Sequence, residues 1–189
     1  MNTPNKLTIS RMIITPIFLA VFLIDAIPFH FGIAMLLFIA GSLTDLFDGK
    51  IARKLGIVTN FGKLADPLAD KMLTTSALLG FMALGYCNVW VLFIILFREF
   101  AISSMRLIAA ADGLVIPANM WGKVKTTIQM VASIATMLGL TLTYDFHLLP
   151  ETFPLAIIAS VLFWLMAAAT AISGIVYIIQ GTKVIDFSK

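Results

Sequence analysis

The chain consists of long apolar runs separated by short polar segments. A helix that crosses the hydrocarbon core of a bilayer needs about 20 consecutive, mainly apolar residues. Strands of a membrane barrel would instead show runs of about ten residues with alternating hydrophobicity. The runs here are continuous and longer, so we predict an all-α fold with six transmembrane helices. The expected helices are Leu7–Ile27, Phe31–Ala52, Gly62–Gly85, Val89–Ala111, Met120–Leu142 and Phe153–Ile179. Because Pro67 removes a backbone hydrogen bond, the third helix either begins after Gly62 or bends.

The amino-acid composition also favours a membrane protein over a water-soluble one. Of the 189 residues, 60% are hydrophobic and 12% are charged, whereas soluble domains carry about 25% charged residues. The chain length predicts a single domain over residues 1–189. The one cysteine, Cys87, excludes an intramolecular disulfide and is interpreted as a small apolar side chain.

Lysine and arginine residues are confined to one side of the predicted helices. The three connections on the other side, around residues 25–30, 85–88 and 143–152, contain neither. Under the positive-inside rule, both termini and the basic connections face the cytoplasm. Thr3–Thr8 has the turn and cap residues of a helix start, and together with Arg11 this short segment is expected to lie along the membrane interface.

Four aspartates lie near the cytoplasmic ends of the second and third predicted helices. Asp45 and Asp48 are three residues apart and Asp66 and Asp70 are four apart, so each pair shares one helix face. Ionised side chains inside a membrane helix are costly and are functional candidates. Convergent carboxylates repel one another unless some are protonated or cations bind, and oxygen ligands favour Mg²⁺ or Mn²⁺ over zinc. This pattern predicts phosphoryl transfer on a nucleotide-linked substrate, with two divalent cations and an aspartate that accepts the proton of the attacking hydroxyl.

The residues around these aspartates resemble the signature of the CDP-alcohol phosphatidyltransferase family at every fixed position. The matching run is Asp45-x2-Asp48-Gly49-x2-Ala52-Arg53-x8-Gly62-x3-Asp66-x3-Asp70. The resemblance implies that all four aspartates are metal ligands and that Asp70 is also the catalytic base. It further implies a homodimer and a reaction that releases CMP. The residues that the resemblance assigns to CDP binding are Asp45, Gly49, Ala52, Arg53 and Gly62.

An acceptor alcohol that carries a phosphate needs cations beyond those around the CDP group. Candidates for the acceptor phosphate are Arg98, Arg106, Lys123 and Lys125. Glu99 is a candidate counter-ion of Arg98, although adjacent residues on a helix do not face each other. The runs Pro4-Asn5-x-Leu7-Thr8-x2-Arg11 and Trp121-Gly122-Lys123-x-Lys125-Thr126 resemble family members that join CDP-diacylglycerol to glycerol 3-phosphate.

Three alternatives to this interpretation remain. A family member that uses phosphatidylglycerol and makes cardiolipin shares the Asp66–Lys71 region, but its phosphodiester acceptor should need fewer cations. An ion-coupled transporter would carry its charges near the bilayer midplane in both halves of the chain. An intramembrane aspartyl protease would lack the Gly-x2-Ala-Arg spacing. We therefore expect an enzyme of phospholipid biosynthesis in the bacterial cytoplasmic membrane, with its active site facing the cytoplasm and no nucleic-acid partner.

Overall fold

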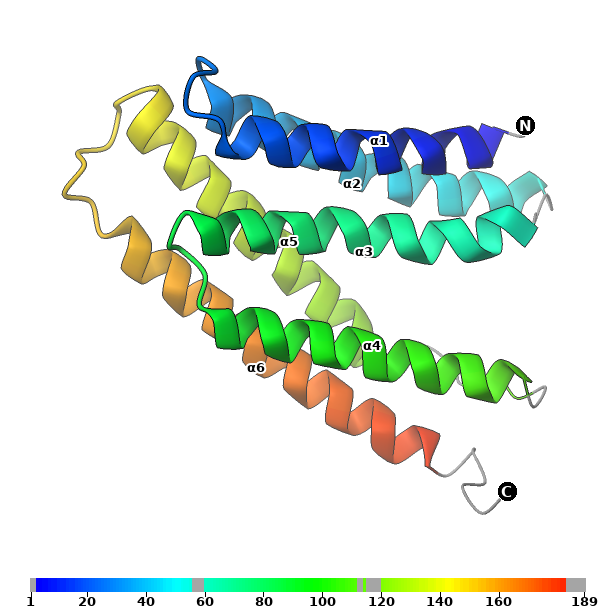
Figure 1. Ribbon diagram of the computed structural model, residues 1–189. Helices are drawn as coiled ribbons and strands as arrows, with labels where there is room; N and C mark the ends of the chain where they lie inside the picture. Colours follow the sequence, from blue (N-terminus) through cyan, green and yellow to red (C-terminus); the bar gives the residue numbers. More distant parts are fainter. Residues whose placement is uncertain (1–2, 56–59, 112–113, 115–119, 183–189) are drawn as a thin grey trace. The chain divides into compact units, whose positions relative to one another are not determined.

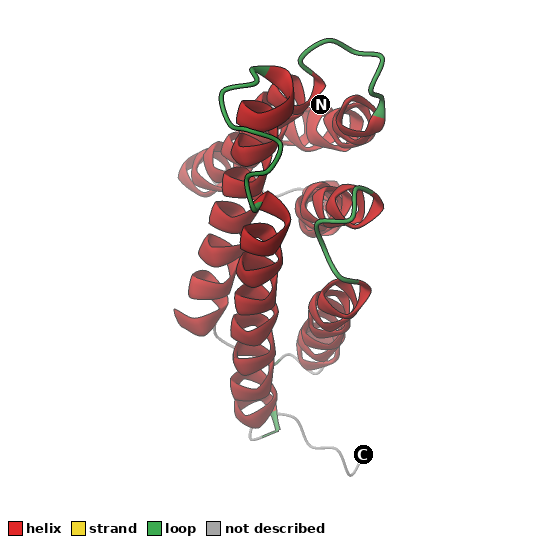
Figure 2. Cartoon of the chain, turned by 90° about the vertical axis from the view of Figure 1, so that its left-hand side faces the viewer, coloured by secondary structure: helices red, strands yellow, loops and turns green. Residues whose placement is uncertain are grey.

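The computed structural model describes residues 3–55, 60–111, 114 and 120–182; the side chains of residues 3–7, 45–55, 60–67, 70 and 111 lie outside this description. The described chain is helical and contains no strand, which confirms the all-α prediction (Figure 2). The helices are α1 (Thr3–Leu23), α2 (His30–Leu55), α3 (Asn60–Ala83), α4 (Val89–Ala111), α5 (Met120–Leu140) and α6 (Leu155–Gly181) (Figure 1). A short π-helical turn, η1 (Thr141–Asp145), directly follows α5.

The observed helices correspond one to one with the predicted ones. α4 has the predicted bounds, and the other helix ends differ from the expected ones by a few residues. α1 begins at Thr3, within the segment whose cap residues predict a helix start but four residues before the expected Leu7, and continues through Pro16. The interfacial position of Thr3–Thr8 stays a prediction. α3 begins at Asn60, so the prediction that it starts after Gly62 is wrong. The alternative prediction, a bend at Pro67, stays a prediction.

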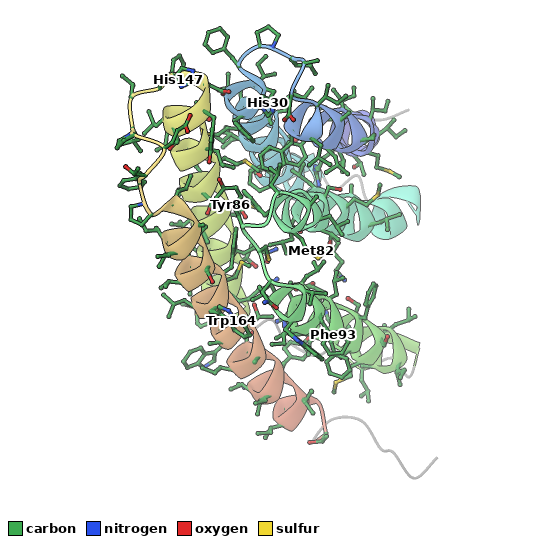
Figure 3. The ribbon with its side chains drawn as sticks, turned by 60° about the vertical axis from the view of Figure 1, so that its left-hand side comes forward. His30, Met82, Tyr86, Phe93, His147 and Trp164 are labelled. Atoms are coloured by element: carbon green, nitrogen blue, oxygen red, sulfur yellow. The ribbon has the colours of Figure 1, made fainter. Side chains whose placement is uncertain are left out.

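Apolar helices and exposed apolar side chains indicate a membrane protein. Among the described residues, Met120–Asp145 and α6 are long and apolar enough to cross a bilayer, and Thr8–Leu23 and His30–Thr44 are shorter apolar helical segments. Phe93 on α4 and Trp164 on α6 are exposed along with many other large apolar side chains (Figure 3). Soluble monomers rarely expose apolar surface on this scale, so lipid is the medium that suits these helices.

The chain divides into two compact units. The first comprises residues 1–84 and 133–155, and the second comprises residues 85–132 and 156–189. α5 therefore contributes its end to the first unit and its beginning to the second. The expectation of one domain over residues 1–189 stays a prediction.

In the first unit, α1 packs against both α2 and α3. One stripe of α1, with a spacing of three or four residues, is buried: Thr8, Arg11, Thr15, Phe18 and Phe22. The Phe22 ring stacks on Phe18 at 5.6 Å and meets Phe81 edge-on at 5.2 Å. A Cβ at Gly80 would lie 2.5 Å from the Phe22 ring, so glycine permits the close approach of α3. The buried stripe thus changes from aromatic to polar toward the N-terminus of α1, where Arg11 is only 1% exposed.

The start of α2 is fixed by η1. The carboxylate of Asp145 accepts a hydrogen bond of 2.7 Å from the backbone N–H of Gly32, in the first turn of α2. A negative charge at a helix N-terminus is favourable because unpaired N–H groups gather there. Phe29 and Phe146 pack beside this contact with ring centroids 5.6 Å apart. Figure 3 shows His30 at the start of α2 and His147 just after η1.

Candidate active site

The four aspartate positions lie on two helices joined by one short connection. Asp45 and Asp48 belong to the last three turns of α2, and Asp66 and Asp70 belong to the first three turns of α3. Their side chains lie outside the described residues, as do those of the predicted CDP-binding positions. The metal-ligand, base and CDP assignments are therefore carried forward as predictions.

A described contact between α2 and α3 lies one turn away from these positions. A Cβ on Gly41 would lie 2.8 Å from Cδ2 of Leu73, so the two helices approach closely there. At about 100° per residue, positions 45 and 48 fall on the face of α2 that holds Gly41. By the same step, positions 70 and 66 fall on the face of α3 that holds Leu73. The backbone thus assigns all four positions to the two helix faces that meet at this contact.

This donor set fits a hard divalent cation. If they act as ligands, four carboxylates from two neighbouring helix faces would supply oxygen atoms of the kind that Mg²⁺ and Mn²⁺ prefer. Elsewhere in the chain, the described side chains form no cluster of three or more histidine, cysteine, aspartate or glutamate residues. The aspartate positions are therefore the candidate metal centre.

The second unit contains a cavity of about 420 Å³ between α4, α5 and α6. Its lining residues are Arg98, Ile102, Arg106, Gly122, Lys123, Thr126, Thr127 and Tyr177. The volume lies in the range of about 300–1,000 Å³ that is usual for small-molecule sites. Three of the four cations predicted to bind the acceptor phosphate, Arg98, Arg106 and Lys123, meet in this cavity. Sequence spacing could not show this convergence, because it joins residues from separate helices.

Arg98 is held at the cavity wall by contacts on two sides. Its Nη1 lies 3.1 Å from Oε1 of Glu99, and its Nη2 donates a hydrogen bond of 3.0 Å to Oγ of Ser173. A Cβ on Gly174 would lie 2.9 Å from Cγ of Arg98, so the arginine stem lies directly against the backbone of α6. The buried Nε makes no hydrogen bond to any group that the structure describes. The guanidinium is therefore fixed in position, and its buried Nε–H is a donor that no described group uses.

Lys125 differs from the other three cations because it pairs with Glu99 and does not line the cavity. It is 6% exposed, and its Nζ lies 2.5 Å from Oε1 of Glu99. It is absent from the cavity lining described above. Glu99 therefore bridges Arg98 and Lys125, and a carboxylate shared between two cations partly balances the charge that they bury.

Two residues of this unit were not singled out from the sequence. Ser173 holds Arg98, and Tyr177 lines the cavity from the same helix. They are four residues apart on α6 and thus share one face. Polar side chains at that spacing in a mainly apolar helix were the available signal.

Cys87, in the segment between α3 and α4, has a thiol of low reactivity. It is 5% exposed, and burial raises the pKa of its thiol to about 11. Because only the thiolate is a good nucleophile, the thiol is unreactive near neutral pH. This agrees with its interpretation as a small apolar side chain.

An all-helical fold, aspartate positions on two adjoining helices and a cavity lined by three cations favour a membrane transferase with an anionic substrate. Residues 1–175 match the family described as CDP-alcohol phosphatidyltransferase, and the chain belongs to this family. The family resemblance inferred from the aspartate signature is thereby confirmed.

Several bacterial relatives match along most of their length. A CDP-diacylglycerol–glycerol-3-phosphate 3-phosphatidyltransferase of Bacillus subtilis (strain 168) is 37% identical over 202 aligned residues, which cover 100% of this chain and 99% of the relative. A protein of the same name from Rickettsia bellii (strain RML369-C) is 34% identical over 93% of each chain. A probable phosphatidylglycerophosphate synthase of Mycobacterium tuberculosis (strain ATCC 25618 / H37Rv) is 36% identical over 96% of this chain and 82% of the relative.

Proposed function

We propose that this enzyme transfers the phosphatidyl group of CDP-diacylglycerol to a hydroxyl of glycerol 3-phosphate, giving phosphatidylglycerophosphate and CMP. The convergence of Arg98, Arg106 and Lys123 on one cavity carries this proposal. A phosphomonoester is close to a dianion, and charge-assisted hydrogen bonds from arginine and lysine are the strong contacts that bind it. The names of the Bacillus and Rickettsia relatives state the same two substrates.

The reaction assigns a separate task to each group of residues. The acceptor hydroxyl attacks the phosphorus on the lipid side of the pyrophosphate, a new P–O bond forms, and the P–O bond to CMP breaks. Asp70 accepts the proton of the hydroxyl. The four aspartates would hold two divalent cations, Mg²⁺ or Mn²⁺, which supply positive charge at the pyrophosphate when bound.

The CDP group is assigned to the end of α2 and the start of α3. Gly49, Ala52 and Gly62 have little or no side chain, which lets a ligand approach the backbone closely. Arg53 carries a planar guanidinium suited to phosphate. Asp45 completes the CDP-binding set.

Phosphatidylglycerol is the second candidate acceptor, and with it the product would be cardiolipin. Its phosphodiester carries one negative charge, and its acyl chains require an apolar environment. The cavity instead offers three cations together with the hydroxyl of Tyr177. This lining favours the small phosphomonoester.

The site is proposed to face the cytoplasm of a bacterial cell membrane. Lysine and arginine are absent from the connections at the opposite helix ends, as the positive-inside rule requires. The lipid substrate then keeps its acyl chains in the bilayer and presents its CDP group at the cytoplasmic surface. The homodimer implied by the family resemblance is part of the same proposal.

The deciding experiment is CMP release by the purified protein from CDP-diacylglycerol in mixed micelles with Mg²⁺ or Mn²⁺. Glycerol 3-phosphate and phosphatidylglycerol are offered separately, and a chelator-treated sample is the control. We expect turnover with glycerol 3-phosphate only. Turnover with phosphatidylglycerol only would reassign the enzyme to cardiolipin synthesis, and turnover that survives complete chelation would refute the metal centre.

A further inference from the structure

The hydroxyl of Tyr177 is buried at the cavity wall and makes no hydrogen bond to the described part of the chain. Tyr177 is 4% exposed, and its Oη meets no donor or acceptor among the groups that the structure describes. A buried hydroxyl without a partner destabilises the fold, so tyrosine hydroxyls inside proteins usually find one. The position of this hydroxyl therefore needs an explanation.

Packing explains the ring of Tyr177 but not its hydroxyl. The ring belongs to a small apolar cluster with Ile102 and Ala109, against which Met105 packs. A phenylalanine would fill the same space and leave no polar atom buried. Since tyrosine is the costlier choice for packing alone, the hydroxyl points to a role in the cavity.

The other hydroxyls of the cavity are already engaged as donors. Oγ1 of Thr126 donates to the backbone oxygen of Gly122 at 3.0 Å, and Oγ1 of Thr127 donates to that of Lys123 at 3.1 Å. Two buried polar atoms of the described lining have no hydrogen-bond partner: Oη of Tyr177 and Nε of Arg98. They come from α6 and α4, so two helices each supply a donor.

We infer that Tyr177 determines acceptor specificity by donating a hydrogen bond from its hydroxyl to the phosphate of a phosphomonoester in this cavity. The inference rests on the proposed function and adds a residue to it. A phosphate dianion accepts several hydrogen bonds, and a hydroxyl donor adds to its binding without adding charge. Ser173, one turn earlier on α6, holds Arg98 beside it, so this face of α6 both positions the arginine and contacts the ligand.

Tyr177→Phe tests the inference because it removes one oxygen and keeps the ring. The KM for glycerol 3-phosphate should rise about tenfold, the usual effect of losing a hydrogen bond to a charged group. The inhibition constant of inorganic phosphate, measured as a competitor of glycerol 3-phosphate, should rise by the same factor. The KM for CDP-diacylglycerol and kcat should stay within about twofold of the parent values.

The melting temperature separates this role from a structural one. Without ligand, Tyr177→Phe should be as stable as the parent protein or more stable, because it removes an unsatisfied buried hydroxyl. Tyr144→Phe is the matched control, because it removes a hydroxyl from η1, which belongs to the other unit. It should leave the KM for glycerol 3-phosphate and the inhibition constant of inorganic phosphate unchanged.

Each result distinguishes the inference from the proposed function. An unchanged KM and phosphate inhibition constant in Tyr177→Phe would overturn the inference and leave the function intact. A lower melting temperature with loss of kcat would also overturn it, because that pattern marks a structural hydroxyl. If the parent enzyme fails to use glycerol 3-phosphate, the proposed function fails before any variant is compared.

Discussion

Arg98 and Glu99 form an ion pair of 3.1 Å although they are adjacent on α4. Neighbouring residues point to different sides of a helix, so the pair depends on the length of the arginine side chain. The same carboxylate oxygen lies 2.5 Å from Nζ of Lys125 on α5. Glu99 therefore orients a cavity cation and ties α4 to α5 at the same time.

Glu99→Gln should lower both stability and acceptor affinity. Removing one member of a buried ion pair leaves charge without compensation and costs about 3 kcal/mol. The melting temperature should fall, and the KM for glycerol 3-phosphate should rise because Arg98 loses an orienting contact. Adding Lys125→Met to Glu99→Gln should recover much of the stability but not the KM. Unchanged stability of the single variant would show that the bridge is energetically unimportant.

Gly174→Ala should displace Arg98 from the cavity wall. The added Cβ would lie 2.9 Å from Cγ of Arg98, close to the rigid base of that side chain. The arginine must then shift, and we expect a rise in the KM for glycerol 3-phosphate with little change in the KM for CDP-diacylglycerol. Ala168→Ser adds one heavy atom at an exposed position of the same helix and serves as the control. Equal kinetics of the two variants would contradict the proposed placement of Arg98.

The helices were predictable because a bilayer demands long apolar runs. α4, for example, has the same bounds as the helix predicted from its apolar run. The positions of the aspartates on α2 and α3 follow from the same runs and from helical periodicity. The contact between Gly41 and Leu73 was not predictable, because helix packing depends on side-chain shape rather than on apolar character. That contact nevertheless lies on the helix faces that the aspartate spacing selects.

The cationic cavity was only partly predictable. The sequence identified Arg98, Arg106, Lys123 and Lys125 by charge, but it could not show that Lys125 pairs with Glu99. Which basic side chain is neutralised depends on contacts between helices. For the same reason, the sequence could not show that Tyr177 lies at this cavity, although its spacing of four residues from Ser173 was a signal.

Arg106 and Lys123 should each contribute to acceptor affinity less than Arg98 does. Both are exposed, so solvent screens their charge. We expect Arg106→Ala or Lys123→Ala to raise the KM for glycerol 3-phosphate roughly fivefold, and Arg98→Ala to raise it further. Added salt should raise the KM of the parent enzyme for glycerol 3-phosphate. The difference in this KM between the parent and the Arg106→Ala or Lys123→Ala variant should then become smaller. Unchanged kinetics in one of these variants would assign that cation to membrane topology alone.

Cys87 should react slowly with maleimides at neutral pH. Burial raises the pKa of its thiol to about 11, so at pH 8 only about one thiol in a thousand is ionised. Labelling should accelerate as the pH rises, because the thiolate fraction grows tenfold per pH unit below the pKa. Protein unfolded in detergent is the control and should label rapidly at pH 8. Fast stoichiometric labelling of the folded enzyme at pH 7 would show that the thiol is accessible and ionised.

Asp70→Asn should abolish turnover while leaving the protein folded. The amide cannot accept the proton of the attacking hydroxyl, and loss of a general base lowers rates by about a hundredfold to ten-thousandfold. Binding of CDP-diacylglycerol, followed as a rise in melting temperature, should be largely retained. Raising the Mn²⁺ concentration distinguishes the two roles assigned to this residue. Recovery of kcat at high Mn²⁺ would mean that Asp70 acts only as a ligand, whereas an inactive variant that still binds substrate at saturating metal identifies the base.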